Sequence, residues 1–225
     1  MDRSILSIVR KSLLNTIVIR KKGILIKGSQ TLSNNILPKK RRGNLSVDNV
    51  ERGFVMISLE LLSEENSLDV YSFEKENREY FERNLPPRPA NYFDLEGFKE
   101  ITRELLTEQR NRDVYMHLIR DSQGMMVGGI NLSVLENDRK TAELGYRIGE
   151  NVRNLGYASE AVKLVLDKAF TTYGSNRIIA GTATDNLASQ RVLLKNGFTF
   201  SRMIENDLHI HNEWVHTAVF EIRRP

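Results

Sequence analysis

The chain has 225 residues, of which 40% are apolar and 28% charged, and it contains no cysteine. These values are typical of a globular protein that buries one core, so we expect one domain with an appendage. Disulfide bonds and thiolate chemistry are excluded by the absence of cysteine. No apolar run approaches the roughly 20 residues that a membrane-spanning helix needs. We therefore expect a reducing, cytoplasmic compartment and no membrane partner.

The net charge of +4 is distributed unevenly along the chain. Residues 1–53 hold 12 Lys and Arg against 3 Asp and Glu, whereas the remainder holds 21 against 26. We interpret residues 1–55 as a basic extension and residues 56–225 as the working domain. Because basic clusters bind phosphates regardless of sequence, contact with RNA or the ribosome is one interpretation of the extension. An organelle transit peptide, or an inert segment ahead of a translation start at Met56, remain open as well.

From residue 54 onward, hydrophobic periodicity and turn residues divide the chain into regular elements. The first predicted elements are a strand at 54–62 and helices at 63–84 and 93–111, separated by the proline-rich stretch LPPRP. Three meander strands follow at 113–121, 125–135 and 141–149. After the next helix, the pattern predicts a strand at 176–185, a short helix at 186–198, and a hairpin at 208–222 that turns near Asn212 and Glu213.

The stretch NVRNLGYASEAVKLVLDKAF, residues 151–170, places a turn directly before an amphipathic helix. Apolar residues at 158, 161, 162, 165, 166 and 169 form one stripe, so this helix is predicted to pack on the sheet. The first N–H groups of a helix lack internal partners and carry a partial positive charge, and Gly156 lets a ligand come close to the backbone. With Arg153 beside it, the turn is suited to a pyrophosphate. A plain strand-to-helix turn is the alternative.

Several segments, in the right order, resemble the GNAT N-acetyltransferase superfamily. RNLGYA at 153–158 fits the Arg/Gln-x-x-Gly-x-Gly/Ala acetyl-CoA signature, and NLASQRVLLKNGF at 186–198 is similar to the second conserved block. AELGYRIGENVRNLGYASEA, NEWVHTAVFEI and ENREYFERNLPPRP resemble the RimJ/RimL branch, the ribosomal-protein N-terminal acetyltransferases. The resemblance covers residues 56–223 and implies an α+β (mixed α/β) GNAT fold. In that fold a central, mostly antiparallel, splayed sheet is flanked by helices.

The resemblance implies acetyl-CoA as co-substrate and locates its binding site. Backbone groups near Arg147 and Ile148 would hold the acetyl carbonyl and the pantetheine arm within the splay. The remaining expected contacts, most of them at the pyrophosphate, are Arg153, Asn154, Leu155, Gly156, Tyr157, Ala158, Asn186 and Lys195. For Asn186, capping of the helix start is the alternative explanation. For Lys195, a cation in the last turn of a helix is expected in any case.

Attack of a neutral amine on a thioester needs a proton acceptor for the amine and a donor for the departing thiolate. By resemblance, Glu143 is the expected general base, acting through water, and Ser189 the expected thiolate donor. The alternatives are a surface carboxylate at a strand start for Glu143 and a capping residue for Ser189. Many family members place a Tyr acid four residues before the Gly of NGF; here that residue is Leu193, which leaves the acid open.

The expected acceptor is the N-terminal α-amino group of a protein, with a ribosomal protein as the first choice. A small amine is the second hypothesis, and an RNA-binding protein with a degenerate acetyltransferase body is the third. Clustered acidic residues in the first predicted helix would suit a basic protein substrate; they are Glu74, Glu76, Glu79 and Glu82. We expect a monomer or a homodimer.

The four histidines give little indication of a site. His209 and His211 alternate on one predicted strand, but a metal needs a third ligand and none is evident nearby, so no metal is expected. His216 lies across the hairpin turn, and its role is open because Val215 replaces the Asp that usually precedes it in the branch. We interpret His117 as structural.

Overall fold

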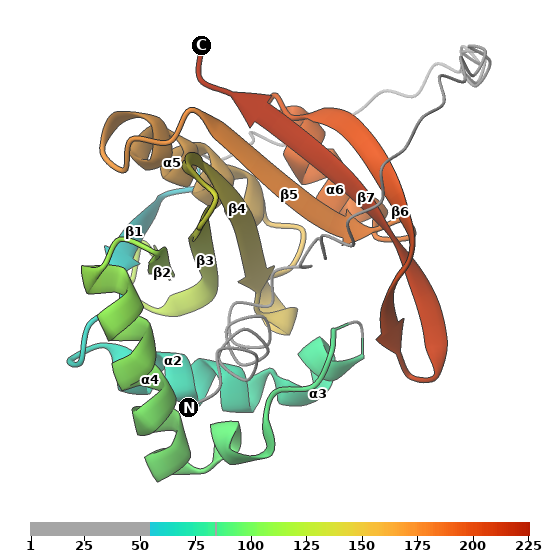
Figure 1. Cartoon of the computed structure of the whole chain (residues 1–225). Helices are drawn as coiled ribbons and strands as arrows, with labels where there is room; N and C mark the ends of the chain where they lie inside the picture. Colours follow the sequence, from blue (N-terminus) through green and yellow to red (C-terminus); the bar gives the residue numbers. More distant parts are fainter. Residues whose placement is uncertain (1–54, 84) are drawn as a thin grey trace, which may run out of the picture. The chain divides into compact units, whose positions relative to one another are not determined.

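The computed structural model describes residues 55–83 and 85–225 (Figure 1). The predicted basic extension therefore lies outside the described residues, apart from its last position, Val55. The predicted strands and helices of the working domain are present. The strands form a seven-stranded sheet in the order β1-β2-β3-β4-β5-β7-β6. The strands are β1 (Ile57–Leu61), β2 (Val114–Asp121), β3 (Met126–Leu135), β4 (Asp138–Ile148), β5 (Arg177–Ala183), β6 (Thr199–Ile210) and β7 (Glu213–Arg223). The helices are α2 (Ser67–Glu76), α3 (Arg78–Glu82), α4 (Leu95–Arg110), α5 (Tyr157–Thr171) and α6 (Leu187–Lys195), with 3₁₀ turns η1 (Ala90–Phe93) and η2 (Glu150–Val152).

The sheet is mixed but mostly antiparallel, as expected. Strands β1 to β4 pair with their sequence neighbours in antiparallel fashion, and β5, β7 and β6 form a second antiparallel group. The two groups meet where β4 and β5 run parallel. Helix α5 is the crossover between these two strands, which parallel pairing requires.

The two halves of the sheet separate soon after they meet. Strand β4 pairs with β5 only from Thr141 to Glu143, opposite Arg177 to Ile179. Beyond Glu143, β4 stays paired with β3 as far as Ile148, and β5 stays paired with β7 as far as Ala183. The facing edges of β4 and β5 are therefore not paired with each other from residue 144 onward, which confirms the expected splay.

Two apolar layers hold the helices against opposite faces of the sheet. The predicted stripe of α5 is buried at Ala161, Val162, Val165, Leu166 and Ala169 and packs with sheet residues such as Leu144. On the other face, α2 and α4 bury their apolar positions against Val114 and Leu118 of β2. In Figure 1, α2 and α4 lie together on one side of the sheet, and α5 lies behind it. Strand alternation consequently assigns each residue of β4 to one of these two faces.

One predicted helix, at 63–84, is interrupted. The structure begins α2 at Ser67 and breaks the chain at Asn77 before α3. The Asn77 side chain explains the break, because its Nδ2 donates to the carbonyl of Phe73 and its Oδ1 accepts from the Glu150 amide, both at 2.9 Å. These bonds fix the end of α2 to the loop that follows β4.

The terminal hairpin is longer than predicted. Strand β6 begins at Thr199 rather than at residue 208, and the turn is formed by His211 and Asn212, which both have positive φ. Strand β6 is an exposed edge strand and its ladder shifts register between Ile204 and Leu208, so the sequence lacks a clear alternation there. The tip of the hairpin reaches α3, where His211 Nε2 lies 2.7 Å from the carbonyl oxygen of Glu82.

Candidate active site

The start of α5 is an uncapped helix end beside the open edge of β4. Gly156 precedes the helix with a φ of 91°, and no side chain caps it. The first intrahelical donor is the Glu160 amide, so the N–H groups of Tyr157, Ala158 and Ser159 come before the ladder begins. Asn154 also has positive φ, at 62°. These features are the ones that an anion-binding helix end requires.

The other residues predicted at the pyrophosphate lie around this helix end. Arg153 is exposed, donates from Nε to the carbonyl of Glu150 at 3.1 Å, and stacks on the ring of Tyr80 at 5.0 Å. Leu155 is 55% exposed. The C-terminal end of α6 is tied to the first turn of α5, because Asn196 Nδ2 donates to Ser159 Oγ at 3.2 Å. Lys195, the residue before Asn196, is exposed at the same end.

Asn186 and Ser189 stand at the start of α6. Asn186 is the N-cap, and its Oδ1 accepts from the Ser189 amide at 3.1 Å. Capping is thus confirmed for Asn186, and a contact with the co-substrate stays a prediction. The Ser189 hydroxyl is not used in the cap: its Oγ lies 2.9 Å from the hydroxyl of Tyr146.

Tyr146 is the residue that sequence reasoning missed. It lies on β4 beyond the last residue that pairs with β5, and its hydroxyl also donates to the Ser189 carbonyl at 3.3 Å. Tyr146 therefore bridges the splay between β4 and α6. Burial raises its pKa to about 12, although the hydrogen bond with Ser189 acts in the opposite direction. The phenol consequently keeps its proton at any physiological pH.

Glu143 is buried, and is not the exposed carboxylate at a strand start that was the alternative to a general base. It is only 6% exposed and lies within β4, which begins at Asp138, so the surface alternative is wrong. Glu143 is also the last residue of β4 that pairs with β5. By strand alternation it shares a face with Arg147, whereas Tyr146 points to the face covered by α5. The carboxylate therefore stands at the mouth of the splay, on the side of α2 and α4.

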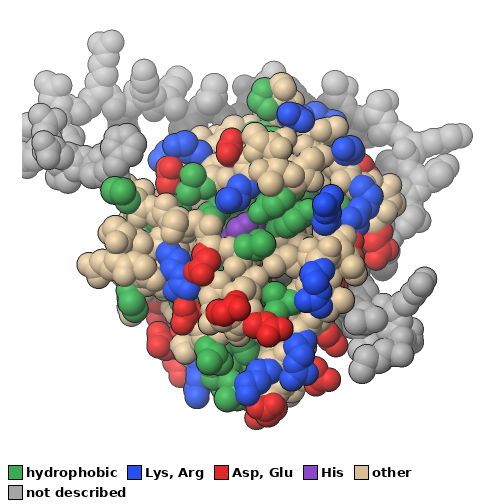
Figure 2. All heavy atoms as spheres, turned by 90° about the vertical axis from the view of Figure 1, so that its left-hand side faces the viewer, with side chains coloured by type: hydrophobic (Ala, Val, Ile, Leu, Met, Phe, Trp, Pro, Cys, Tyr) green, Lys and Arg blue, Asp and Glu red, His purple; other side chains and the backbone are tan. Residues whose placement is uncertain are grey.

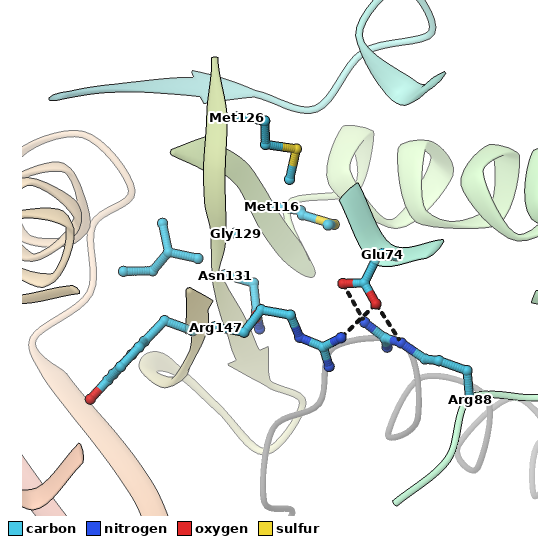
Figure 3. Close-up of a pocket in the computed structure, with 9 residues that line it drawn as sticks. Glu74, Arg88, Met116, Met126, Gly129, Asn131 and Arg147 are labelled. Atoms are coloured by element: carbon cyan, nitrogen blue, oxygen red, sulfur yellow. Dashed lines mark hydrogen bonds and ion pairs between the residues drawn. The ribbon is translucent and has the colours of Figure 1, made fainter. Parts of the chain in front are cut away.

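Arg147 uses its side chain away from the splay. Its Nη1 donates to Glu74 Oε2 at 2.5 Å, and its guanidinium lies 4.5 Å from the ring centre of Phe81. Glu74 also accepts from Arg88, from Nε at 3.2 Å and from Nη2 at 3.1 Å. We call these three residues the Glu74 cluster (Figure 3). Burial, and then the charge of Arg88, lower the pKa of Arg147 to about 10.

The Glu74 cluster corrects the prediction of an acidic surface on the first helix. Glu74 is 3% exposed and is outnumbered by its two arginines, and Glu82 is paired with Arg78 at 3.0 Å. Figure 2 shows acidic and basic side chains interspersed over one face of the molecule. The prediction failed because Arg147 follows Glu74 by 73 residues. The burial of Glu74 could have been predicted from the sequence, because positions 70, 73 and 74 lie on one face of a helix and two of them are the apolar residues Val70 and Phe73.

A pocket adjoins the cluster on the same face of the sheet. It is partly open to solvent and has a cavity volume of about 20 Å³. Its lining comes from α2, the segment after α3, and β2 to β4: Glu74, Arg88, Met116, Met126, Gly129, Ile130, Asn131, Tyr146 and Arg147. Since Tyr146 and Arg147 both line it, the pocket reaches the open half of β4.

The histidines do not come together. His211 lies in the turn beyond β6, so it does not share a strand face with His209, which instead packs on Trp214 at 5.0 Å between ring centres. His216 Nδ1 accepts from the Asn206 amide at 3.1 Å. His117 is 1% exposed and pairs with the Tyr173 hydroxyl at 2.8 Å. Within residues 55–83 and 85–225, no three potential metal-ligating side chains are grouped.

Among the described helices, none combines the length and the apolar character that crossing a bilayer requires.

Comparison with known proteins assigns this geometry to a family. The model of the Acetyltransferase (GNAT) domain matches residues 58–199. The probable N-acetyltransferase YjcK of Bacillus subtilis is 30% identical over 169 residues, which cover 74% of this chain and 92% of that protein.

Solved structures share the fold at lower identity. The ribosomal-protein-S5-alanine acetyltransferase of Vibrio fischeri has a TM-score of 0.70 at 19% identity, covering 74% of this chain and 92% of its own. The spermidine N-acetyltransferase of Vibrio cholerae, solved with CoA and spermine, has a TM-score of 0.63 at 16% identity, covering 74% and 95%. With its splayed sheet and open helix end, the chain belongs to the GNAT acetyltransferase family and is an acetyl-CoA-dependent N-acetyltransferase.

Proposed function

We propose that this enzyme transfers an acetyl group to an α-amino group at the open half of β4. The observation that carries the proposal is the separation of β4 from β5 after Glu143, in a splay that leads to the uncapped start of α5. An extended chain segment fits along such a free strand edge, and a pyrophosphate fits at such a helix end. The residues present therefore suit acetyl-CoA, which supplies the acetyl group as a thioester.

The positions of the residues around the start of α5 suggest which part of acetyl-CoA each would bind. The N–H groups of Tyr157 and Ala158 would hold the pyrophosphate, and the positive φ of Asn154 and Gly156 presents the backbone of the turn. Arg153, Leu155, Asn186 and Lys195 would flank the nucleotide part. Among the backbone groups near Arg147 and Ile148, those that point away from β3 would orient the acetyl and pantetheine groups.

Glu143 is the proposed proton acceptor for the amine, through a water molecule. It is buried at the mouth of the splay, and by strand alternation it shares a face of β4 with Arg147, which lines the pocket. A free α-amino group has a pKa of about 7.7–8.0, so a large minority is already neutral near pH 7.5 and one carboxylate suffices. A lysine side chain, with a pKa of about 10.4, would demand much more of the base.

Ser189 and Tyr146 are the proposed donors for the departing thiolate. The Ser189 hydroxyl lies 2.9 Å from the Tyr146 hydroxyl, and the phenol keeps its proton because its pKa is raised to about 12. In this proposal Tyr146 donates its proton to Ser189 Oγ rather than to the Ser189 carbonyl, which leaves the Ser189 proton to form a hydrogen bond with the sulfur. This arrangement compensates for Leu193 at the position where many family members have Tyr.

The charge of the Glu74 cluster favours an α-amino group over a polyamine as the acetyl acceptor. The Glu74 cluster places two buried guanidiniums and one carboxylate beside the pocket, which would repel a polycation. The fold neighbour from Vibrio fischeri is named for an alanine of ribosomal protein S5, so we place N-termini of ribosomal proteins first among the candidates.

An acceptor panel tests this proposal. The full chain is incubated with acetyl-CoA and either N-terminal peptides of ribosomal proteins, the same peptides with a blocked N-terminus, free lysine side-chain analogues, or spermidine. CoA release is the readout. We expect turnover with free N-termini only, and preferential acetylation of spermidine would overturn the assignment of the acceptor.

A further inference from the structure

One nitrogen of the Glu74 cluster has no partner in the part of the chain that the structure describes. Arg147 is 8% exposed, its Nη1 binds Glu74, and its Nη2 is buried without a hydrogen-bond acceptor. Buried guanidinium nitrogens are normally hydrogen-bonded, because loss of water is not otherwise compensated. The missing acceptor therefore requires an explanation.

The charge balance of the cluster indicates what that acceptor is. One carboxylate, Glu74, faces the guanidiniums of Arg88 and Arg147, and the side chains of all three are at most 8% exposed. Two guanidiniums therefore share the carboxylate of Glu74 in a buried place, where hydrogen-bonded anions stabilise a positive charge. The lowered pKa of Arg147 is the consequence of burial and of the neighbouring Arg88. An anion would supply the missing acceptor for Nη2 of Arg147 and would also interact favourably with the guanidinium charge.

The pocket gives this anion a place. Arg147, Glu74 and Arg88 line it together with Gly129 and Asn131 (Figure 3). Gly129 pairs directly with Arg147 across the ladder, and a Cβ atom built there would come no closer than 3.8 Å to another residue. The absence of a side chain at Gly129 therefore keeps the pocket open on the β3 side of Arg147.

The pocket also lies at a suitable distance from Glu143, the proposed proton acceptor. Arg147 follows Glu143 by four residues on one face of β4, which corresponds to about 13 Å between their Cα atoms. Both side chains are long, so a small acceptor can present an amine to one and an anion to the other.

We propose that this pocket binds a carboxylate of the acceptor, paired with Nη2 of Arg147, so that the enzyme selects α-amines that carry a nearby carboxylate. The inference deepens the proposed function and depends on it for the identity of the amine. Two sources share this chemistry: the C-terminal carboxylate of a free amino acid or dipeptide, and an acidic side chain near a protein N-terminus. An arginine fork suits a carboxylate because it can donate two parallel hydrogen bonds.

Three dipeptides separate the sources in acetyl-transfer assays on the full chain. Ser-Gln-amide carries no carboxylate, Ser-Gln acid carries one at its C-terminus, and Ser-Glu-amide carries one on its side chain. We expect KM to be at least about tenfold lower for one of the two acids than for Ser-Gln-amide, with a smaller change in kcat. Equal KM values for all three would overturn the proposal while leaving the acetyltransferase activity established.

Arg147→Met should remove this discrimination by raising the KM of the preferred acid to that of the amide. Glu74 keeps Arg88 in that variant, so the buried carboxylate is not left alone. Arg78→Met is the matched control, because Arg78 also pairs with a glutamate and stacks on a phenylalanine, Phe93, but is 52% exposed. Retained discrimination in Arg147→Met would contradict the role of the pocket.

A second measurement does not depend on turnover. Sodium acetate, compared with sodium chloride at equal ionic strength, should raise the Tm of the wild-type chain by roughly 2–4 °C and leave Arg147→Met unchanged. Equal shifts in both proteins would overturn the anion site. If acetate stabilises only the wild type but no amine is acetylated, the site stands and the proposed function fails.

Discussion

Glu74→Gln is the perturbation whose effect follows most directly from the coordinates. The substitution keeps the size of the side chain and removes a negative charge that two buried guanidiniums share. Glu74, Arg88 and Arg147 are 3%, 5% and 8% exposed, so water cannot replace the lost carboxylate. Removing one partner of a buried ion pair costs about 3–5 kcal/mol. At about 2–4 °C per kcal/mol for a domain of this size, Tm should fall by roughly 6–20 °C.

Urea unfolding followed by circular dichroism, with parallel thermal scans, measures this loss. Glu79→Gln is the matched control: Glu79 is exposed on the neighbouring helix α3, so its loss should be within about 0.5 kcal/mol of zero. Arg147→Met should cost less than Glu74→Gln, because it leaves Glu74 and Arg88 as a balanced pair. If Glu74→Gln unfolds at the same urea concentration as Glu79→Gln, the buried cluster does not contribute as described.

Three further predictions concern catalysis and pH. Tyr146→Phe should lower kcat by about 10-fold or more while KM for acetyl-CoA changes little, and Ser189→Ala added to it should cost little extra because the hydroxyls act as one pair. Glu143→Gln should lower turnover most at acidic pH, where the amine is mostly protonated; a loss that is the same at every pH would indicate a structural role. Burial, and then the charge of Lys168, lower the pKa of His117 from 6.5 in the unfolded chain to about 4 in the folded one. The contribution of neutral His117 to the free energy of unfolding is therefore complete above pH 6.5 and is lost as the pH falls to about 4. The free energy of unfolding should drop by about 3 kcal/mol across that window, and His117→Gln should show a flatter pH dependence in urea titrations.

Much of the fold could be predicted because its signals are local. The stripe on α5 and the three meander strands follow from residue spacing, and the helix end at Gly156 follows from a glycine that the structure places at positive φ. Ordered motifs then identified the family and with it the splay. Periodicity alone does not indicate the splay, since β4 keeps one alternation on both sides of Glu143.

The missed parts of the site depend on contacts between distant segments. Tyr146 meets Ser189 across 43 residues, and nothing in the strand pattern indicates that its hydroxyl reaches α6. Glu74 meets Arg147 across 73 residues, so the local pattern of four glutamates on one predicted helix indicates an acidic surface although Glu74 is buried. The break at Asn77 has the same origin, because its partner is the amide of Glu150.

Calorimetric titration of CoA into the full chain tests the central claim, that the start of α5 receives the diphosphate. Gly156→Glu adds a side chain at a φ of 91° and a negative charge at the helix end, and Gly124→Glu makes the same change at a φ of 79°, in a β2–β3 turn with open surroundings. We expect CoA to bind the wild type and Gly124→Glu equally, and Gly156→Glu at least about 100-fold more weakly, since close approach and charge both oppose the phosphates. Equal affinity in all three proteins, or no binding to the wild type, would contradict the account.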